Sequence, residues 1–249
     1  MNYQQQMKLK RFLNKPLLTY AFLIIQVAVY LMMEVYGLRF GQLGGSTSIS
    51  VLMKFGAMSP LSIVFQHEYW RFVTPIFVHI GLTHLLLNSV SLYFVGRILE
   101  DVLGHVRFFL VYMLSGILGN VISFGFGRNF QSVSAGASTA IFGMFVAFIV
   151  LGRIYPYNPV LRHMSSTMSM LIILNLVMNL FSSGVDILGH LGGVIGGILM
   201  TLIVSVPRVE SSGVYIEDGI DIHKRILALI VFLFLIVFSI VLGFSQVGL

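Results

Sequence analysis

Three short stretches of an otherwise apolar sequence hold side chains that could carry out acyl transfer. His84 and Asn88 lie in THLLLNS, Ser138 lies in GASTAIFG, and His190 lies in DILGHLGG. A serine hydroxyl becomes a nucleophile when a nearby base takes its proton. Imidazole and amide N–H groups can stabilise the oxyanion that then forms. Together these residue types indicate a serine-type acyl-transfer site.

Each stretch taken alone has a plainer interpretation. His84 and Asn88 are four residues apart on one helix face, where they could simply hydrogen-bond across a helix bundle. A single serine in a membrane helix usually bonds a backbone carbonyl, and Ala140 stands where the G-x-S-x-G nucleophile elbow needs glycine. His190 is open to a relay, a ligand or a structural role. It lies among the small-xxx-small pairs of residues 189–197, which permit close helix approach.

The composition places the chain in a membrane. Of its 249 residues 57% are hydrophobic and only 10% are charged, and the mean hydropathy is +0.94. A soluble domain carries about a quarter charged residues. The net charge of +6 is interpreted as membrane topology, because no Lys/Arg run is interleaved with aromatics as nucleic-acid binding would need. The absence of cysteine excludes disulfides and a thiol nucleophile.

The apolar runs predict seven transmembrane helices, since crossing the hydrocarbon takes about 20 apolar residues. The predicted spans are 16–36, 82–99, 106–124, 136–154, 164–181, 186–206 and 225–244. The first is too long for a signal-peptide core, so it is expected to be retained. Residues 37–81 are too polar to span, and they predict a partly helical segment in the outer interface with Tyr69 and Trp70 at headgroup depth.

The basic residues set the predicted orientation. With a cytoplasmic N-terminus and an external C-terminus, the inside segments hold eleven Lys and Arg residues and the outside segments hold four. The inside set is Lys8, Lys10, Arg11, Lys15, Arg97, Arg107, Arg153, Arg162, Arg208, Lys224 and Arg225; the outside set is Arg39, Lys54, Arg71 and Arg128. This asymmetry follows the positive-inside rule. We see no internal repeat of the kind found in transporters.

This topology brings the candidate active-site residues to one depth in the membrane. His84, Asn88, Ser138 and His190 all fall in the outer halves of their helices, although these helices run in both directions. Ser138 is near the N-terminal end of its helix, where free N–H groups and the helix dipole favour negative charge. A nucleophile, a base and oxyanion donors at one depth form an acyl-transfer constellation.

The chain resembles the rhomboid intramembrane serine proteases over roughly residues 55–197. The motifs that carry the resemblance are Trp70-Arg71, Phe77, His79, His84 and Asn88, the Gly-Arg-x-x-Glu turn at 96–100, the Gly-x-Ser block at 136–143 and the Gly-His-x-Gly-Gly block at 189–193. The resemblance implies an all-α membrane protein with a rhomboid-like six-helix core plus one C-terminal transmembrane helix (6+1). The expected division is a cytoplasmic basic N-terminus (1–15), the catalytic core (16–206), a cytoplasmic linker (207–224) and the seventh helix with an external tail (225–249).

The resemblance also implies roles for individual residues. Ser138 is expected to be the nucleophile and His190 its general base, without an essential carboxylate. The oxyanion hole is expected to include His84, Asn88, the Ser138 backbone N–H and Ala137. The supporting residues are His79, Gly136, which lets the loop approach, and Phe142, which packs on the His190 ring. Thr139 departs from the glycine that commonly follows the nucleophile, so the contact between the fourth and sixth helices is expected to differ slightly.

The predicted function is a multi-pass serine endopeptidase of the cell membrane. It would cleave transmembrane segments of protein substrates near the outer leaflet, and its other partner is the lipid bilayer. The alternatives are a catalytically inactive rhomboid-like chaperone that binds membrane helices, and a small transporter or channel. No cofactor or metal is expected, because the histidines lack an H-E-x-x-H spacing. The sequence does not indicate whether the protein is a monomer or an oligomer. Asp186 is interpreted as a helix N-cap, with orientation of the His190 imidazole as the alternative; His67, His105, His163 and His223 are expected to be solvated.

Overall fold

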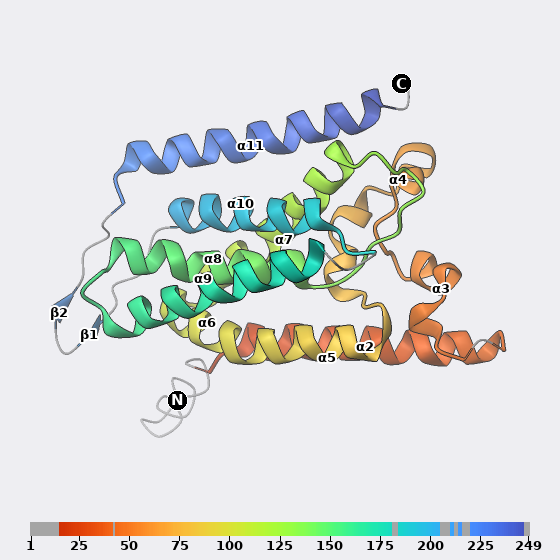
Figure 1. Ribbon diagram of the computed structural model, residues 1–249, viewed down its shortest axis with the longest axis horizontal. Helices are drawn as coiled ribbons and strands as arrows, with labels where there is room; N and C mark the ends of the chain where they lie inside the picture. Colours follow the sequence, from red (N-terminus) through yellow and green to blue (C-terminus); the bar gives the residue numbers. More distant parts are fainter. Residues whose placement is uncertain are drawn as a thin grey trace, which may run out of the picture.

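The computed structural model describes residues 15–41, 43–180, 184–204, 210–211, 214–215 and 220–246. Long helices run side by side through this part of the chain (Figure 1), and each coincides with one predicted apolar span. They are α2 (Leu17–Arg39), α5 (Gly81–Ser91) continued by the π-helical turn Leu92–Gly96 and α6 (Arg97–Leu103), α7 (His105–Phe126), α8 (Ser138–Ile154), α9 (Pro159–Leu180), α10 (Ile187–Ile203) and α11 (Ile222–Ser245). The largest difference from prediction is that α9 begins at Pro159 instead of Met164. The predicted ends at residues 181 and 206 lie outside the described residues.

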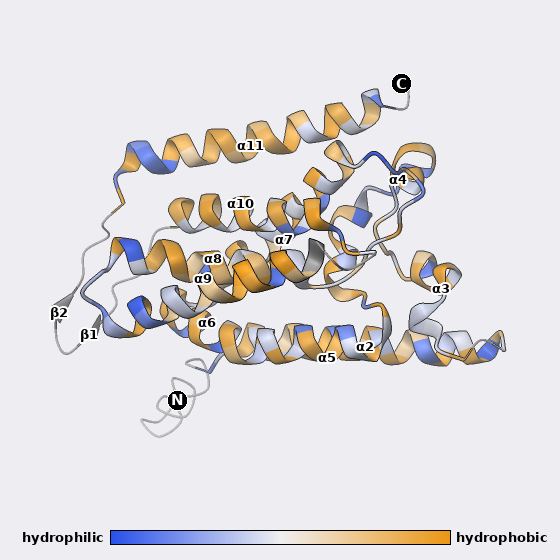
Figure 2. Cartoon of the chain, in the orientation of Figure 1, coloured by the Kyte–Doolittle hydropathy of each residue, from blue (hydrophilic) through white to orange (hydrophobic). Residues whose placement is uncertain are grey.

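Five of these helices are long and apolar enough to cross a membrane, and α8 and α10 are shorter apolar helices of 17 residues each. Figure 2 shows that apolar residues dominate the long helices. The non-helical segments that precede α8 and α10 contribute residues to a cavity. Irregular backbone at membrane depth is tolerated in such a place, because its polar groups meet protein or water instead of lipid. The described chain is therefore an all-α membrane protein, as predicted.

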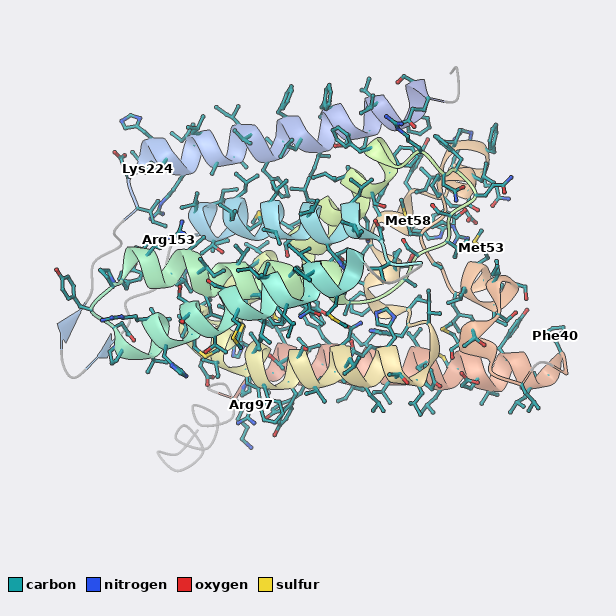
Figure 3. The ribbon with its side chains drawn as sticks, viewed as in Figure 1. Phe40, Met53, Met58, Arg97, Arg153 and Lys224 are labelled. Atoms are coloured by element: carbon teal, nitrogen blue, oxygen red, sulfur yellow. The ribbon has the colours of Figure 1, made fainter. Side chains whose placement is uncertain are left out.

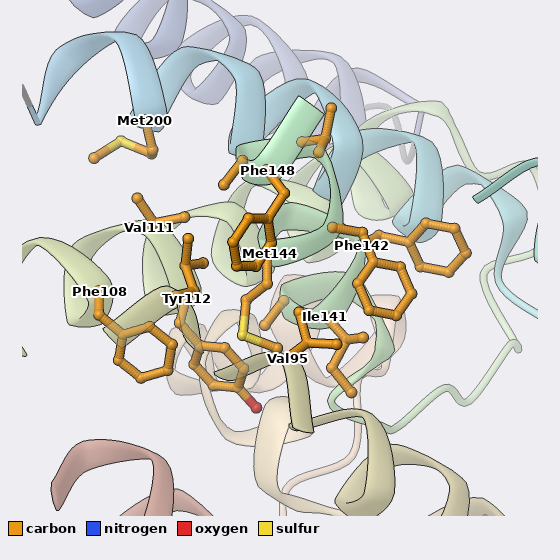
Figure 4. Close-up of a cluster of buried hydrophobic side chains, with 14 of the residues drawn as sticks. Val95, Phe108, Val111, Tyr112, Ile141, Phe142, Met144, Phe148 and Met200 are labelled. Atoms are coloured by element: carbon orange, nitrogen blue, oxygen red, sulfur yellow. The ribbon is translucent and has the colours of Figure 1, made fainter. Parts of the chain in front are cut away.

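Helix α7 is the centre of the bundle. Its apolar window is 72% buried, against 22% for α2, 33% for residues 81–103, 11% for 159–178 and 22% for α11. Figure 4 shows Phe108, Val111 and Tyr112 of α7 beside Met144 and Phe148 of α8. A helix that is apolar on all sides is expected in a protein interior, and α7 provides the surface on which α8, α10 and α11 pack.

Glycines bring α10 against two neighbours at once. Side chains added at Gly192 and Gly196 would meet the α7 backbone at Gly119 and Ser115, each at 2.8 Å. Side chains added at Gly193 and Gly197 would overlap carbonyl oxygens of α8, those of Thr139 and Gly143. The close approach that the small-xxx-small pairs predict is confirmed, and it sets the spacing between α8 and α10.

The segment between α2 and α5 is partly helical, as predicted. It contains η1 (Gly45–Thr47), α3 (Ile49–Lys54), α4 (Pro60–Gln66), η2 (Tyr69–Phe72) and η3 (Thr74–Phe77). The buried Arg71 side chain fastens it, because its guanidinium donates to the carbonyl oxygens of Ala57 at 2.6 Å and Met53 at 2.8 Å, and to Glu68 at 2.6 Å. Its neighbour Trp70 is 53% exposed, which suits an interfacial side chain.

Three of the basic residues predicted to lie inside are found toward one end of the bundle. They are Arg97, Arg153 and Lys224, and Met53 and Met58 lie toward the other end (Figure 3). The predicted basic residues Lys8, Lys10, Arg11 and Arg208 lie outside the described residues. Within the predicted linker 207–224, the two-residue strands β1 (Glu210–Ser211) and β2 (Val214–Tyr215) pair antiparallel.

Candidate active site

Ser138 and His190 meet through a hydrogen bond between side chains. The Ser138 Oγ lies 2.7 Å from Nε2 of His190, although the residues are 52 positions apart. Ser138 is the first residue of α8, and His190 lies in the first turn of α10. The glycine contacts between α8 and α10 explain why the two helix ends come this close. The arrangement can transfer a proton from the hydroxyl to the imidazole.

The pair lies beside a cavity of about 540 Å³. Its walls come from α5, α8 and the segments before α8 and α10, and Asn175 of α9 also lines it. The side chains of Phe142 and Phe145 on α8 contribute apolar surface. Such a cavity has room for a peptide segment next to the Ser138 hydroxyl, with both apolar and polar walls.

His84 and Asn88 lie on the cavity wall beside Gly136. Gly136 has φ +143°, and a Cβ added there would lie 2.5 Å from Cε1 of His84 and 3.5 Å from Nδ2 of Asn88. Both its backbone conformation and the lack of space therefore require glycine. Asn88 is 7% exposed, and within the described part of the chain no group accepts a hydrogen bond from its Nδ2. A buried donor that lines a cavity is available to a bound oxygen atom.

The fully buried His79 stands behind this wall. Its ring meets that of His84 edge to face, with centroids 5.4 Å apart. Burial in the loop before α5 lowers the pKa of His79 to about 3, so the ring is neutral at physiological pH. Its Nε2 accepts the Ala137 backbone N–H at 3.4 Å. His79 thus contacts both the loop before Ser138 and the histidine of the cavity wall.

The residues that flank the nucleophile pack closely on neighbouring helices. The Phe142 ring stacks on the His190 imidazole, with centroids 4.6 Å apart and 24° between the planes. Thr139, the departure from the common glycine, is accommodated by a glycine on another helix. A Cβ added at Gly119 of α7 would lie 2.9 Å from that of Thr139. The absence of a side chain at Gly119 leaves room for the threonine.

Asp186 is the N-cap of α10, because its Oδ1 accepts the Gly189 N–H at 2.8 Å. The capping interpretation is confirmed.

Sequence reasoning missed two further polar features. Asn175 lines the cavity, and its place within an apolar helix could have identified it. The second is a contact of His105, which was expected to be solvated: its side chain is 36% exposed, and its Nδ1 lies 2.5 Å from the buried Glu100 carboxylate.

No group of three or more potential metal ligands is found among the described residues.

Comparison with known proteins gives the site its context. Residues 66–207 match the family model of the Rhomboid domain, which covers more than half of the chain. The chain belongs to the rhomboid family. It is 36% identical over 200 residues to rhomboid protease GluP of Bacillus subtilis (strain 168), which covers 80% of this chain and 37% of GluP. It is 39% identical over 139 residues to putative rhomboid protease YdcA of the same organism, covering 55% of this chain and 67% of YdcA.

The relatives also include a protein named as inactive. The chain is 40% identical over 102 residues to inactive RHOMBOID-like protein 8 of Arabidopsis thaliana, covering 41% of this chain and 28% of that protein. Membership of the rhomboid family, which includes named proteases, therefore supports an intramembrane protease or a rhomboid-like function. The local geometry must distinguish between the two.

Proposed function

We propose that this rhomboid is an intramembrane serine endopeptidase that acts through a Ser138–His190 dyad. The observation that carries the proposal is the 2.7 Å contact between Ser138 Oγ and His190 Nε2 beside a cavity. A serine in a membrane helix with a purely structural role would be expected to bond a backbone carbonyl of its own helix, as Ser115 does. Ser138 instead meets the one type of side chain that suits a general base near neutral pH.

The reaction begins when His190 Nε2 takes the Ser138 hydroxyl proton and Oγ attacks the substrate carbonyl carbon. The carbonyl oxygen becomes negatively charged, and donors that meet it only in this state lower the barrier. We assign this role to Asn88 Nδ2, His84 and the Ser138 backbone N–H. The Ala137 N–H would join them only by leaving His79 Nε2, to which it donates at 3.4 Å. The N–H groups in the first turn of α8 have no partner within the helix, and the helix dipole there favours negative charge.

Collapse of the tetrahedral intermediate breaks the C–N bond. His190 gives its proton to the leaving amine, and Ser138 stays joined to the acyl group as an ester. Water then attacks the ester carbon, with His190 taking the water proton and returning it to Oγ. The water must arrive through the cavity, so the cavity is expected to open to the external side of the membrane.

The substrate is expected to be a transmembrane segment that has partly unwound near the outer leaflet. A regular helix ties its carbonyl groups into backbone hydrogen bonds, which keeps them from attack. Segments with Gly, Ser or Pro unwind more readily, because these residues have lower helix propensity than Ala, and such segments should be preferred. The cytoplasmic N-terminus, the external C-terminus and the cell-membrane location belong to the same proposal. It is supported by the excess of basic residues in the predicted inside segments, which follows the positive-inside rule; three of them, Arg97, Arg153 and Lys224, lie toward one end of the bundle (Figure 3).

The competing function is a binding-only rhomboid, which the likeness to inactive RHOMBOID-like protein 8 keeps open. The deciding experiment is cleavage of a fluorescent transmembrane substrate in liposomes by wild type, Ser138→Ala and His190→Ala. Ser169→Ala and His163→Ala serve as matched controls, because Ser169 bonds the Ser165 carbonyl within α9 and His163 is exposed. We expect cleavage by wild type and both controls and none by the dyad variants. A folded wild type that cleaves none of several helix-destabilised substrates would favour the binding-only function.

A further inference from the structure

Asp186 makes more contacts than a helix cap requires. A cap needs one side-chain oxygen to accept an N–H of the first turn, and Oδ1 does this with Gly189 at 2.8 Å. The other oxygen, Oδ2, accepts two hydroxyl groups. Ser123 Oγ lies 2.6 Å from it and Ser134 Oγ lies 3.2 Å from it. The half-buried carboxylate therefore joins three segments of the chain.

These three segments are the ones that carry or support the dyad. Gly189 belongs to the first turn of α10, next to His190. Ser134 lies four residues before Ser138, in the loop that leads into α8. Ser123 lies on α7, the central helix against which α8 and α10 pack. Because Oδ2 accepts from Ser134 while Oδ1 holds the α10 terminus, one side chain fixes the nucleophile's loop relative to the base's helix.

The loop is held firmly on its other side, so the Ser134 contact can be transmitted to Ser138. The backbone of Ser134 pairs with Met58 through two hydrogen bonds, of 2.8 and 3.2 Å. Gly136 N–H donates to the Pro75 carbonyl at 2.9 Å. These bonds fasten the loop to the segment between α2 and α5. The Asp186 carboxylate supplies the matching attachment to α10.

We propose that Asp186 is a positioning residue that sets the distance between Ser138 and His190 by bridging Ser134 and the N-terminus of α10. This inference rests on the proposed protease function. The carboxylate need not touch the reacting atoms to act in this way. A displacement of about 1 Å between reacting groups can lower a rate by about 100-fold, so a bridge between the two dyad segments has a direct effect on turnover.

The two oxygens allow capping and bridging to be separated. The variant Asp186→Asn retains one acceptor oxygen in its side chain, and asparagine is a good N-cap residue. The NH₂ group that replaces the second oxygen cannot accept a hydroxyl hydrogen, although the serine hydroxyls can accept from it. The variant therefore keeps the cap and weakens the bridge, because neutral hydrogen bonds replace bonds to a charged carboxylate. Ser134→Ala removes only the bridge to the loop and leaves the cap untouched. Ser123→Ala removes the α7 contact and is the matched control.

The experiment measures kcat and KM for a transmembrane substrate in liposomes, the rate at which a fluorophosphonate labels Ser138, and the melting temperature in detergent. We expect Ser134→Ala to lower kcat and the labelling rate by about 10-fold to 100-fold with KM unchanged, and Asp186→Asn to lower them by a smaller factor. The double variant should be no slower than the slower single variant. Ser123→Ala should keep most of the wild-type kcat.

Each result has a defined meaning. The inference is overturned if Ser134→Ala turns over at the wild-type rate, or if the effects of Asp186→Asn and Ser134→Ala on kcat multiply in the double variant. If Asp186→Asn has a much lower melting temperature than wild type, the result for Ser134→Ala alone decides the inference, because that variant keeps the Asp186 cap of α10. A wild type that neither cleaves substrate nor reacts with the fluorophosphonate would contradict the proposed function itself, whereas an active wild type with active variants would contradict only the role of Asp186.

Discussion

The ring of Phe142 lies almost flat against the imidazole of His190, with centroids 4.6 Å apart. Phe142 is one helical turn beyond Ser138 on α8, so both side chains face His190 from the same helix. The aromatic ring closes one side of the imidazole, and Ser138 contacts its edge through Nε2. We infer that Phe142 restricts the imidazole to the plane in which it can accept the hydroxyl proton.

Replacement of Phe142 by alanine should therefore lower kcat by a larger factor than it changes KM, when both are measured on the folded protein. Aromatic pairs contribute about 0.5–1.5 kcal/mol beyond burial, which corresponds to a decrease in kcat of up to about 10-fold. Phe142→Tyr keeps the ring and should remain active. Phe148→Ala, which removes an equally buried ring of α8, is the control for lost core packing. Equal kcat in the folded fractions of Phe142→Ala and Phe148→Ala would contradict this role.

Gly193 gives a test of the spacing between α8 and α10. An alanine Cβ there would overlap the carbonyl oxygen of Thr139, the residue next to Ser138. Backbone atoms cannot move aside as a flexible side chain can, so the helices must separate near the dyad. We expect Gly193→Ala to lower kcat by about 100-fold and the free energy of unfolding by about 1–3 kcal/mol.

Gly197→Ala is the matched control for Gly193→Ala. Its Cβ would overlap the carbonyl oxygen of Gly143, also on α8 but more than one turn farther from Ser138. Gly197→Ala should lower the free energy of unfolding by a similar amount, but its kcat should stay closer to the wild-type value than that of Gly193→Ala. If both variants lose turnover equally when corrected for the folded fraction, local spacing at the dyad is not what Gly193 provides.

Glu100 should control stability without taking part in the reaction. Its buried carboxylate accepts the backbone N–H groups of Leu18 at 2.9 Å and Thr19 at 2.8 Å, and the Thr19 hydroxyl at 2.7 Å. It thus ties the start of α2 to α6. Glu100→Gln replaces an acceptor oxygen by a donor, and we expect a loss of about 3 kcal/mol in the free energy of unfolding.

Denaturation in detergent, with substrate cleavage measured on the folded protein, checks the Glu100 prediction. The exposed neighbour Asp101 supplies the control variant, Asp101→Asn, which should unfold like wild type. The folded fraction of Glu100→Gln should keep the wild-type kcat and KM. A Glu100→Gln protein that is as stable as wild type would refute the prediction, since the contacts of the carboxylate would then contribute nothing.

The sequence predicted the helices well because each is a continuous apolar run, and hydropathy alone locates such runs. It could not predict which distant groups share a carboxylate. Ser123 and Ser134 are 63 and 52 residues from Asp186, and ordinary serines carry no signal of such a contact. The contact between His105 and Glu100 was missed for the same reason, because the burial of Glu100 depends on α2, which packs on it from far earlier in the chain.

The site shows a similar division. The sequence was enough to predict the types of the site residues and their common depth in the membrane. The Gly-x-x-x-Gly pattern on α10 also predicted close packing, which the structure confirms. The accommodation of Thr139 could not be predicted, because it depends on Gly119 of α7, and nothing in the sequence indicates which helix packs against that glycine. Pairs that compensate for one another across helices become visible only when the helices are placed.

Asn88 provides the last test, because its buried Nδ2 is the best candidate for an oxyanion donor. Loss of one such donor lowers kcat by about 10² to 10³ in soluble serine proteases, and we expect Asn88→Ala to fall in this range with little change in KM. Ser89→Ala is a close control, since Ser89 accepts the Gln26 side chain at 2.8 Å and so joins α5 to α2. That variant should lose stability and keep kcat.

A second substitution separates donation to the oxyanion from simple support of the cavity wall. If Asn88 and His84 stabilise the same oxyanion, each single variant should slow both cleavage and fluorophosphonate labelling, because both reactions pass through a negatively charged oxygen. A wall residue would instead alter KM and leave labelling by the small reagent near the wild-type rate. The ratio of the two effects in Asn88→Ala therefore distinguishes an oxyanion donor from a residue that only shapes the cavity.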